Sequence, residues 1–147
     1  MIRVSRRVSL AVPPETVWPW IADPTRFAEW RRGAGVTSAA PVDDGPIGVG
    51  SRFRMDVTTQ GRSGSVECTV TTYEPNRRFA FASKDASGFA GSVDTRLEPE
   101  GAGTRLDFAF ELQLPGGWRL MHPVISGVLN QAVDTDFATL QAVLKSS

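Results

Sequence analysis

Few side chains in this sequence are suited to moving a proton inside an apolar interior. Proton transfer needs a titratable group within hydrogen-bond reach of the reacting atom. The sequence holds one histidine, His122, and one tyrosine, Tyr73, and it places Asp136 and Arg6 among apolar neighbours. Asp136, His122, Arg6 and Tyr73 are therefore the candidate catalytic residues, for a reaction that the residues do not name.

Asp136 is the most informative of the four, because its place on a predicted helix allows two orientations. Ala132 and Leu140, one turn to either side, belong to the apolar arc of that helix. An inward carboxylate would be desolvated, so its pKa should rise unless a cation or several donors meet it. Arg6, on the apolar face of the first strand, is the expected partner. In the alternative, Asp136 lies on the flank of the arc, where it reaches water or caps a backbone group.

Other polar signals favour structural roles. Cys68 is the one cysteine, and its place in an alternating strand pattern is typical of a small buried hydrophobic residue. A zinc site needs three or four Cys, His or carboxylate ligands, so neither a metal nor a cofactor is expected. His122 precedes Pro123, and a position at a helix start or at a cavity rim is favoured for it over the role of a catalytic base. Gly48-Val49-Gly50 precedes a strand, which predicts a turn rather than a phosphate loop.

Composition narrows the class of protein. The 16 basic and 16 acidic side chains cancel, which argues against a nucleic-acid partner. The pairs Arg31-Arg32 and Arg77-Arg78 are expected on solvated faces. No stretch approaches the roughly 20 apolar residues of a membrane span, and the expected location is cytoplasmic. No linker divides the sequence, so residues 1–147 are expected to form one domain.

The elements that must position these side chains begin with a strand and two short helices. Val4, Val8 and Leu10 recur at period two, which predicts the strand. Pro13-Pro14 ends it and opens a helix that Pro19 should shorten or kink. A cap at Asp23 predicts the second short helix, which ends at about Trp30.

A sheet and a long helix make up the rest. From about Gly35 onward, apolar and polar residues alternate, which predicts an antiparallel sheet with one apolar face. A segment of helical period then ends at Lys145, and its roughly 33 Å would cross the sheet. One helix rarely fills such a concave volume, so a partly unfilled apolar interior is expected to bind a small ligand. The expected cavity lining is Trp30, Phe53, Met55, Phe79, Phe81, Phe89, Val93, Phe108, Phe110, Leu129, Val133 and Asp136.

Several segments carry a family resemblance over essentially the whole chain. They are residues 11–18 (AVPPETVW), 21–30 (IADPTRFAEW), 48–53 (GVGSRF), 73–81 (YEPNRRFAF) and 136–141 (DFATLQ). Together they resemble the polyketide cyclase/dehydrase-like branch of the START-like (SRPBCC) superfamily. The resemblance implies an α+β helix-grip fold, in which a seven-stranded antiparallel sheet curves around a long C-terminal helix. It also implies two short helices after the first strand and a deep apolar cavity; Pro19 departs from the family, which usually has a good helix former there.

The expected function is the binding or transport of an apolar small molecule, lipid, aromatic or polyketide-like, in that cavity. The alternative is a polyketide cyclase/dehydratase-type enzyme that acts on such a ligand in the same cavity. A third class, a partner-binding role, is also carried by such folds. Trp18, Trp20 and Trp30 cluster around the short helices, either as packing or as a lid over the cavity mouth. The ligand and the oligomeric state are left open.

Overall fold

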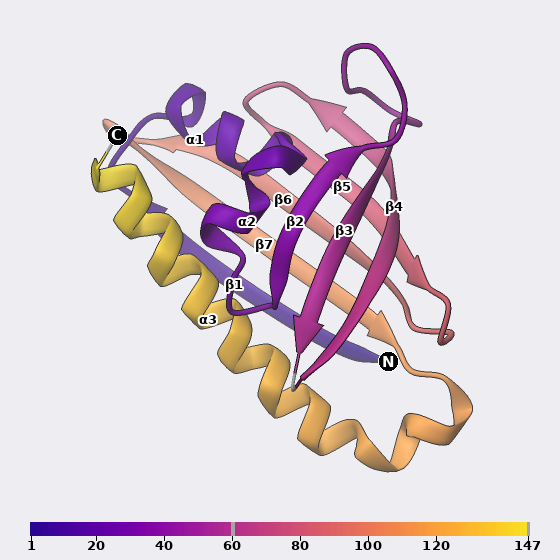
Figure 1. The fold of residues 1–147 in the computed structure, drawn as a ribbon. Coiled ribbons are helices and arrows are strands. Elements are labelled where there is room, and N and C mark those ends of the chain that lie inside the picture. The colour runs from indigo at the N-terminus through magenta and orange to yellow at the C-terminus, as the bar shows by residue number, and fades with distance from the viewer. Residues whose placement is uncertain (60, 147) are drawn as a thin grey trace.

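A single curved antiparallel sheet dominates the computed structural model, which describes residues 1–59 and 61–146 (Figure 1). The order of its seven strands is β1-β7-β6-β5-β4-β3-β2, so β1 and β2 form the two edges. The expected sheet is confirmed. The strands are β1 (Ile2–Leu10), β2 (Val36–Pro41), β3 (Arg52–Thr59), β4 (Arg62–Glu74), β5 (Arg78–Asp85), β6 (Ala90–Glu100) and β7 (Gly103–Gln113).

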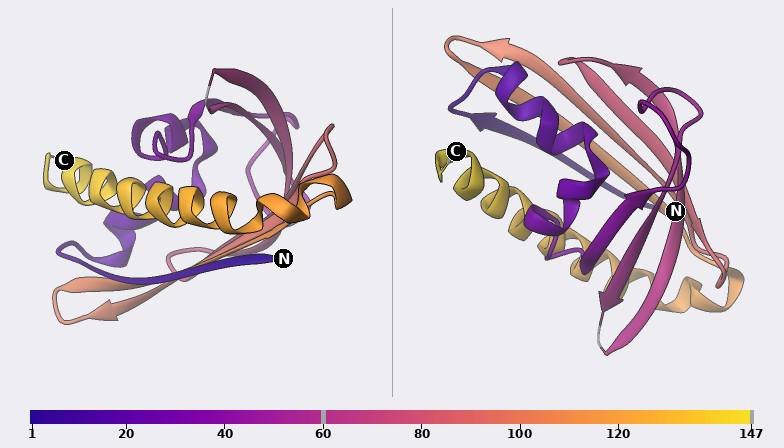
Figure 2. Two further views of the ribbon diagram at one scale, coloured as in Figure 1. Left: turned by 90° about the horizontal axis from the view of Figure 1, so that it is seen from below. Right: turned by 45° about the horizontal axis from the view of Figure 1, so that its top comes forward.

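The long C-terminal helix, α3 (His122–Ser146), has 25 residues and crosses the concave side of the sheet (Figure 2). A 3-10 helix, η2 (Gly116–Met121), leads into it from β7. The expected helix-grip arrangement is therefore confirmed. Between His122 and Gln131 no side chain of α3 is buried, whereas the second half contributes a buried stripe. This stripe consists of Ala132, Val133, Asp136, Phe137, Leu140 and Leu144.

Short helices link the two edge strands across the concave side. They are α1 (Pro14–Ala22), η1 (Pro24–Arg26) and α2 (Phe27–Trp30). As expected, Asp23 acts as a cap, because its side chain accepts a hydrogen bond from Thr25 N at 3.0 Å. Pro19 lies inside α1, which ends after nine residues. α1 contacts β6 and β7, while α2 contacts β2 and α3, so the short helices cover one end of the interior (Figure 1).

Aromatic rings fill the centre of the interior. Phe27 of α2 meets Phe53 of β3 at 5.8 Å and Phe81 of β5 at 6.3 Å between ring centroids. Phe53 and Phe81 are themselves 5.0 Å apart, and Phe79 adjoins Phe81 at 5.8 Å. All four rings are buried. Edge-to-face and stacked contacts of this kind hold the short helices against the sheet.

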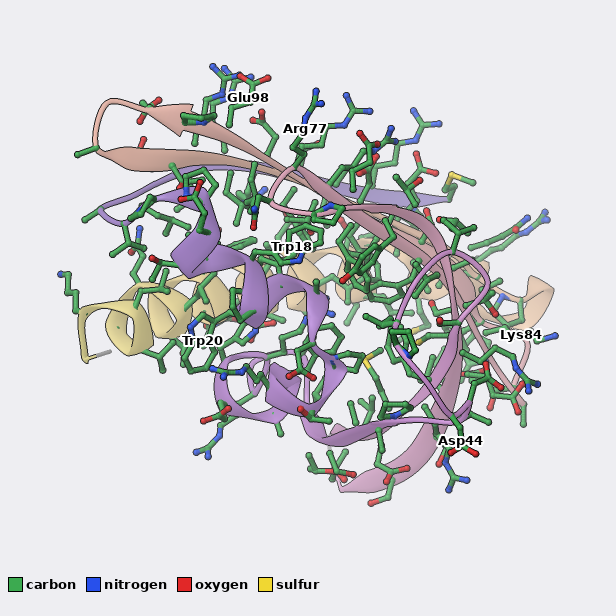
Figure 3. All side chains as sticks on the ribbon, turned by 90° about the horizontal axis from the view of Figure 1, so that it is seen from above. Trp18, Trp20, Asp44, Arg77, Lys84 and Glu98 are labelled. Atoms are coloured by element: carbon green, nitrogen blue, oxygen red, sulfur yellow. The ribbon has the colours of Figure 1, made fainter. Side chains whose placement is uncertain are left out.

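Many charged side chains lie on the outer surface. Asp44, Arg77, Lys84 and Glu98 all lie at the periphery of the molecule (Figure 3). In the part of the chain that the structure describes, no helix is long and apolar enough to cross a membrane.

Candidate functional site

Two oppositely charged side chains are buried together on the concave side. Arg31, directly after α2, is 7% exposed, and Asp136, in the middle of α3, is 4% exposed. Both line a small pocket of about 30 Å³, whose remaining walls are apolar. Those walls are Trp30, Ala34, Phe108, Phe110, Leu129, Ala132, Val133 and Phe137.

Asp136 faces inward, which is the first of the two orientations that the sequence allows. Its Oδ1 accepts hydrogen bonds from Gly33 N at 2.7 Å and from Ala34 N at 3.3 Å. Burial raises the pKa of Asp136 to about 6, although the Arg31 charge and these two N–H groups favour the carboxylate. The protonated and ionised forms are therefore close in free energy near pH 6.

Gly33 lets the backbone after α2 approach α3 closely. A Cβ at this position would lie 2.7 Å from Asp136 Oδ1 and 2.8 Å from the carbonyl oxygen of Ala132. Such distances are shorter than real side chains show, so a residue without Cβ is required here. The glycine therefore sets the hydrogen bond that holds Asp136.

The Arg31 guanidinium is enclosed by aromatic rings. Its central carbon lies 5.1 Å from the ring centroid of Phe27, 5.4 Å from that of Trp30 and 5.8 Å from that of Phe81. Arg31 Nε is buried without a hydrogen-bond partner, and the ion pairs found among the described residues do not include Arg31. Desolvation lowers the pKa of Arg31, although the charge of Asp136 opposes this shift.

The buried position of Arg31 corrects a sequence expectation, which placed the pair Arg31-Arg32 on a solvated face. Only Arg32 is exposed; its Nε donates to the carbonyl oxygen of Ala28 at 3.0 Å. The signal that identifies Arg31 is its spacing from Phe27. Residues four apart share one face of a helical turn, and Phe27 faces the core.

Arg6 is not the partner of Asp136, which corrects a second expectation. Arg6 Nε donates to Asp134 Oδ1 at 2.7 Å, and its Nη2 donates to Asn130 Oδ1 at 2.8 Å. Asn130 and Asp134 are one turn apart on the flank of α3 that faces β1. Asp136 is two residues further along, about 200° around the helix, and so points elsewhere.

The other two catalytic candidates lie apart from this pocket. His122 is exposed at the first residue of α3, with Nε2 3.4 Å from the carbonyl oxygen of Met1. It lies fourteen positions before Asp136 along the helix, a distance of about 21 Å. Tyr73 is half-buried on β4 and meets the Trp18 ring edge-on at 5.5 Å. The four candidates therefore do not form one catalytic cluster.

Cys68 is buried on the inner face of β4. Desolvation raises the pKa of its thiol to about 12, against the opposing charge of Arg31. A thiol with so high a pKa is a poor nucleophile at neutral pH. Among the described residues, no group of three or more His, Cys, Asp or Glu side chains is arranged to hold a metal ion.

A set of inward-facing apolar side chains, on three strands and on the first half of α3, is only half-buried. On the strands, the neighbouring inward-facing side chains are fully buried. Phe110 and Leu129 belong to this set and also line the pocket that holds Arg31 and Asp136. The half-buried side chains are Val57, Val66, Phe110, Leu112, Ile125 and Leu129.

A second, wider hollow of about 380 Å³ opens between α1 and the loop that joins β2 to β3. Trp18, Tyr73 and Phe53 form its aromatic wall. Trp18 and Trp20 point to different sides of α1 (Figure 3), and only Trp18 lines the hollow. Trp30 is a packing residue, because it is buried and its Nε1 donates to the carbonyl oxygen of Trp20 at 3.0 Å.

The expected cavity residues thus separate into groups. Trp30, Phe108, Phe110, Leu129, Val133 and Asp136 line the inner pocket, and Phe53 lines the wider hollow. Met55, Phe79, Phe81 and Val93 are buried in the core. Phe89 precedes β6, in a turn where its N–H donates to Asp85 Oδ1 at 3.1 Å, and its ring contacts Trp118 at 5.3 Å.

Comparison with solved structures defines the class of fold. A START superfamily protein from Mycobacterium smegmatis has a TM-score of 0.78 at 20% identity, with 98% of this chain and 97% of that chain covered. A Chromobacterium violaceum protein has a TM-score of 0.77 at 16% identity, covering 97% and 96%. DynU16, a protein in the dynemicin biosynthetic locus, has a TM-score of 0.70 at 21% identity, covering 99% of this chain and 48% of that chain. These likenesses establish a START-like helix-grip fold.

The sequence itself matches the family described as polyketide cyclase / dehydrase and lipid transport over residues 1–145. The chain belongs to this family, which confirms the resemblance carried by its motifs. No curated protein matches the sequence.

Proposed function

We propose that the protein binds an apolar small molecule between the first half of α3 and the inner face of the sheet. The observation that carries the proposal is a set of apolar side chains that face inward and yet stay half-buried. They are Val57, Val66, Phe110, Leu112, Ile125 and Leu129. Apolar side chains on an inner face normally pack to high density. Leaving them exposed to water loses the stabilisation that their burial would give. A ligand would cover them. The family description, which includes lipid transport, supports the same function.

Titration with N-phenylnaphthylamine, an uncharged probe that fluoresces in apolar surroundings, tests the proposal. We expect saturable binding, because the probe would replace water along these half-buried walls. Leu129→Trp should weaken binding about tenfold or more, since the larger ring would occupy the space. The matched control is Val128→Trp, because Val128 is exposed and lies about 100° around α3 from Leu129. Absence of saturable binding, or equal binding by both variants, would contradict the proposed function.

Asp136 and Arg31 favour a second candidate function, an enzyme that eliminates water from a β-hydroxyketone. An Asp136 carboxylate with a pKa near 6 could remove the proton next to the carbonyl. The Arg31 guanidinium would stabilise the resulting enolate oxygen. Asp136 would then return this proton to the departing hydroxyl group, so that one water molecule leaves and a conjugated enone remains.

This activity can be assayed with a β-hydroxyketone that bears a phenyl group on the hydroxyl carbon, because its enone product absorbs strongly. If the protein is an enzyme of this kind, the native chain accelerates enone formation and Asp136→Asn does not. Equal rates with and without native protein would leave binding as the function.

A further inference from the structure

We propose that the ligand of this protein is an apolar acid whose anionic oxygen atoms bind the Arg31 guanidinium in the inner pocket. The inference rests on the proposed function, since it assigns a chemical class to the molecule that the apolar space would hold. In this arrangement the anionic group of the ligand lies in the inner pocket. Its apolar body lies against the half-buried side chains beside Phe110 and Leu129.

The Arg31 guanidinium is buried without an ion pair to any residue that the structure describes. A buried donor without an acceptor costs free energy, and a buried guanidinium is normally paired with an anion or several carbonyl oxygens. Here Nε has no partner, and the guanidinium is held in place by the faces of Phe27, Trp30 and Phe81. The rings fix the orientation of the donors without using them. An acceptor from outside the chain would complete the site.

Asp136 is already held by donors other than Arg31. Both of its backbone hydrogen bonds, from Gly33 and Ala34, come from the segment that follows α2. Asp136 therefore stays in position without a direct ion pair to Arg31. Its charge offsets that of Arg31 while the pocket is empty, and its raised pKa lets it become neutral when a second anion approaches.

The charged and titratable groups around Asp136 support these separate roles, in which Arg31 binds the ligand and Asp136 is held by the backbone. Arg31 reaches it from the segment after α2, and Cys68 on β4 lies near Arg31. On the β1 side, Arg6 is committed to Asp134. Phe108 and Phe110, from β7, are the pocket walls opposite α3. Arg31 is thus the cation of this pocket.

The size of the inner pocket limits what can enter it. The pocket of about 30 Å³ has room for roughly two water-sized groups. This matches the two oxygen atoms of a carboxylate and not a whole ligand. The body of the ligand must then extend past Phe110 and Leu129, where the half-buried side chains leave apolar surface uncovered.

Displacement of bound N-phenylnaphthylamine by decanoate and by decanol, two molecules of equal chain length, tests the inference. We expect decanoate to bind the native protein about tenfold or more tightly than decanol, because charge-assisted hydrogen bonds to a buried guanidinium are strong. Arg31→Met should remove this preference and leave decanol binding within about threefold. Asp136→Asn should tighten decanoate binding, since it removes the competing negative charge while keeping an oxygen acceptor for Gly33.

Arg32→Met is the matched control, because Arg32 is the exposed neighbour and should keep the preference for decanoate. If Arg31→Met folds poorly, Arg31→Met combined with Asp136→Asn removes both buried charges and serves as the second variant. Equal native affinities for decanoate and decanol, or a preference that survives loss of Arg31, would overturn the inference alone. If neither molecule nor the probe binds, the proposed function fails, and this inference fails with it.

Discussion

Arg31 and Asp136 reach one small pocket from different elements, yet each is held by groups other than its counterpart. Aromatic faces hold the guanidinium, and the backbone N–H groups of Gly33 and Ala34 hold the carboxylate. Two buried charges that do not satisfy each other weaken the fold. We therefore expect ligand binding, rather than stability, to explain why these two charges are buried together.

The stability of the protein should depend on the titration of Asp136. Its folded pKa, about 6, lies above the usual value near 3.9, so the folded state binds the proton more tightly. Its stabilising effect is present in full below about pH 4 and is lost as pH rises through about 6. Relative to native protein, Asp136→Asn should therefore be more stable by about 2–3 kcal/mol near pH 7.5 and nearly equal near pH 4. Denaturant unfolding across this range measures the difference.

Asp134→Asn is the control for that experiment, because the hydrogen bond from Arg6 lowers the pKa of Asp134. A lowered pKa means that the ionised form is favoured by folding, so its contribution is lost as pH falls. The two variants on one helix should thus show opposite pH trends. A destabilised Asp136→Asn at neutral pH would contradict the burial argument.

Arg6 and Asp136 should be energetically independent. Arg6 pairs with Asp134, and the two α3 aspartates point in different directions. In a double-mutant cycle, Arg6→Met and Asp136→Asn should therefore add to within about 0.5 kcal/mol. A larger coupling energy in chemical denaturation would mean that Arg6 does act on Asp136.

Replacement of Gly33 by alanine should destabilise the protein. The new Cβ would crowd Asp136 Oδ1 and the Ala132 carbonyl oxygen, so α3 or the segment after α2 must shift. Overpacking of this kind costs about 1–3 kcal/mol. Gly48→Ala is the control, since a Cβ there meets nothing within 4 Å. Thermal unfolding of both variants would show the difference, and equal melting temperatures would contradict the close approach.

Cys68 should resist modification in the folded protein. Burial on β4 and a pKa of about 12 keep its thiol protonated and out of reach of an aromatic disulfide reagent. We expect labelling at the rate of unfolding, accelerated by denaturant. Rapid labelling of the native protein would contradict the burial of this thiol.

The fold could be predicted because its determinants are local. Alternating apolar residues indicated the strands, Asp23 and Pro24 marked a helix start, and the apolar arc of the last helix indicated its buried face. The inward orientation of Asp136 was one of two alternatives on that arc. Choosing between them required the position of Gly33, which lies more than a hundred residues away in sequence.

The rest of the site depends on how elements pack. The sequence offered Arg6 as a partner because it shares a strand face with apolar residues, but the rotation of α3 against β1 brings Asp134 to it instead. Arg31 was missed because it adjoins a second arginine, and only its spacing from Phe27 separates the two. How far α3 stands from the sheet, which decides how completely the interior is filled, has no local signal.

The most direct test of an internal ligand site is the position of a bound probe. Intermolecular nuclear Overhauser effects between N-phenylnaphthylamine and labelled methyl groups would report it at the level of single residues. We expect contacts from the probe to the methyl groups of Ile125 and Leu129, which are half-buried on the inward side of α3, and none to Ile47, which lines the wider hollow. Contacts to Ile47 alone, or no contact to any inward-facing methyl group, would contradict an internal binding site beneath α3.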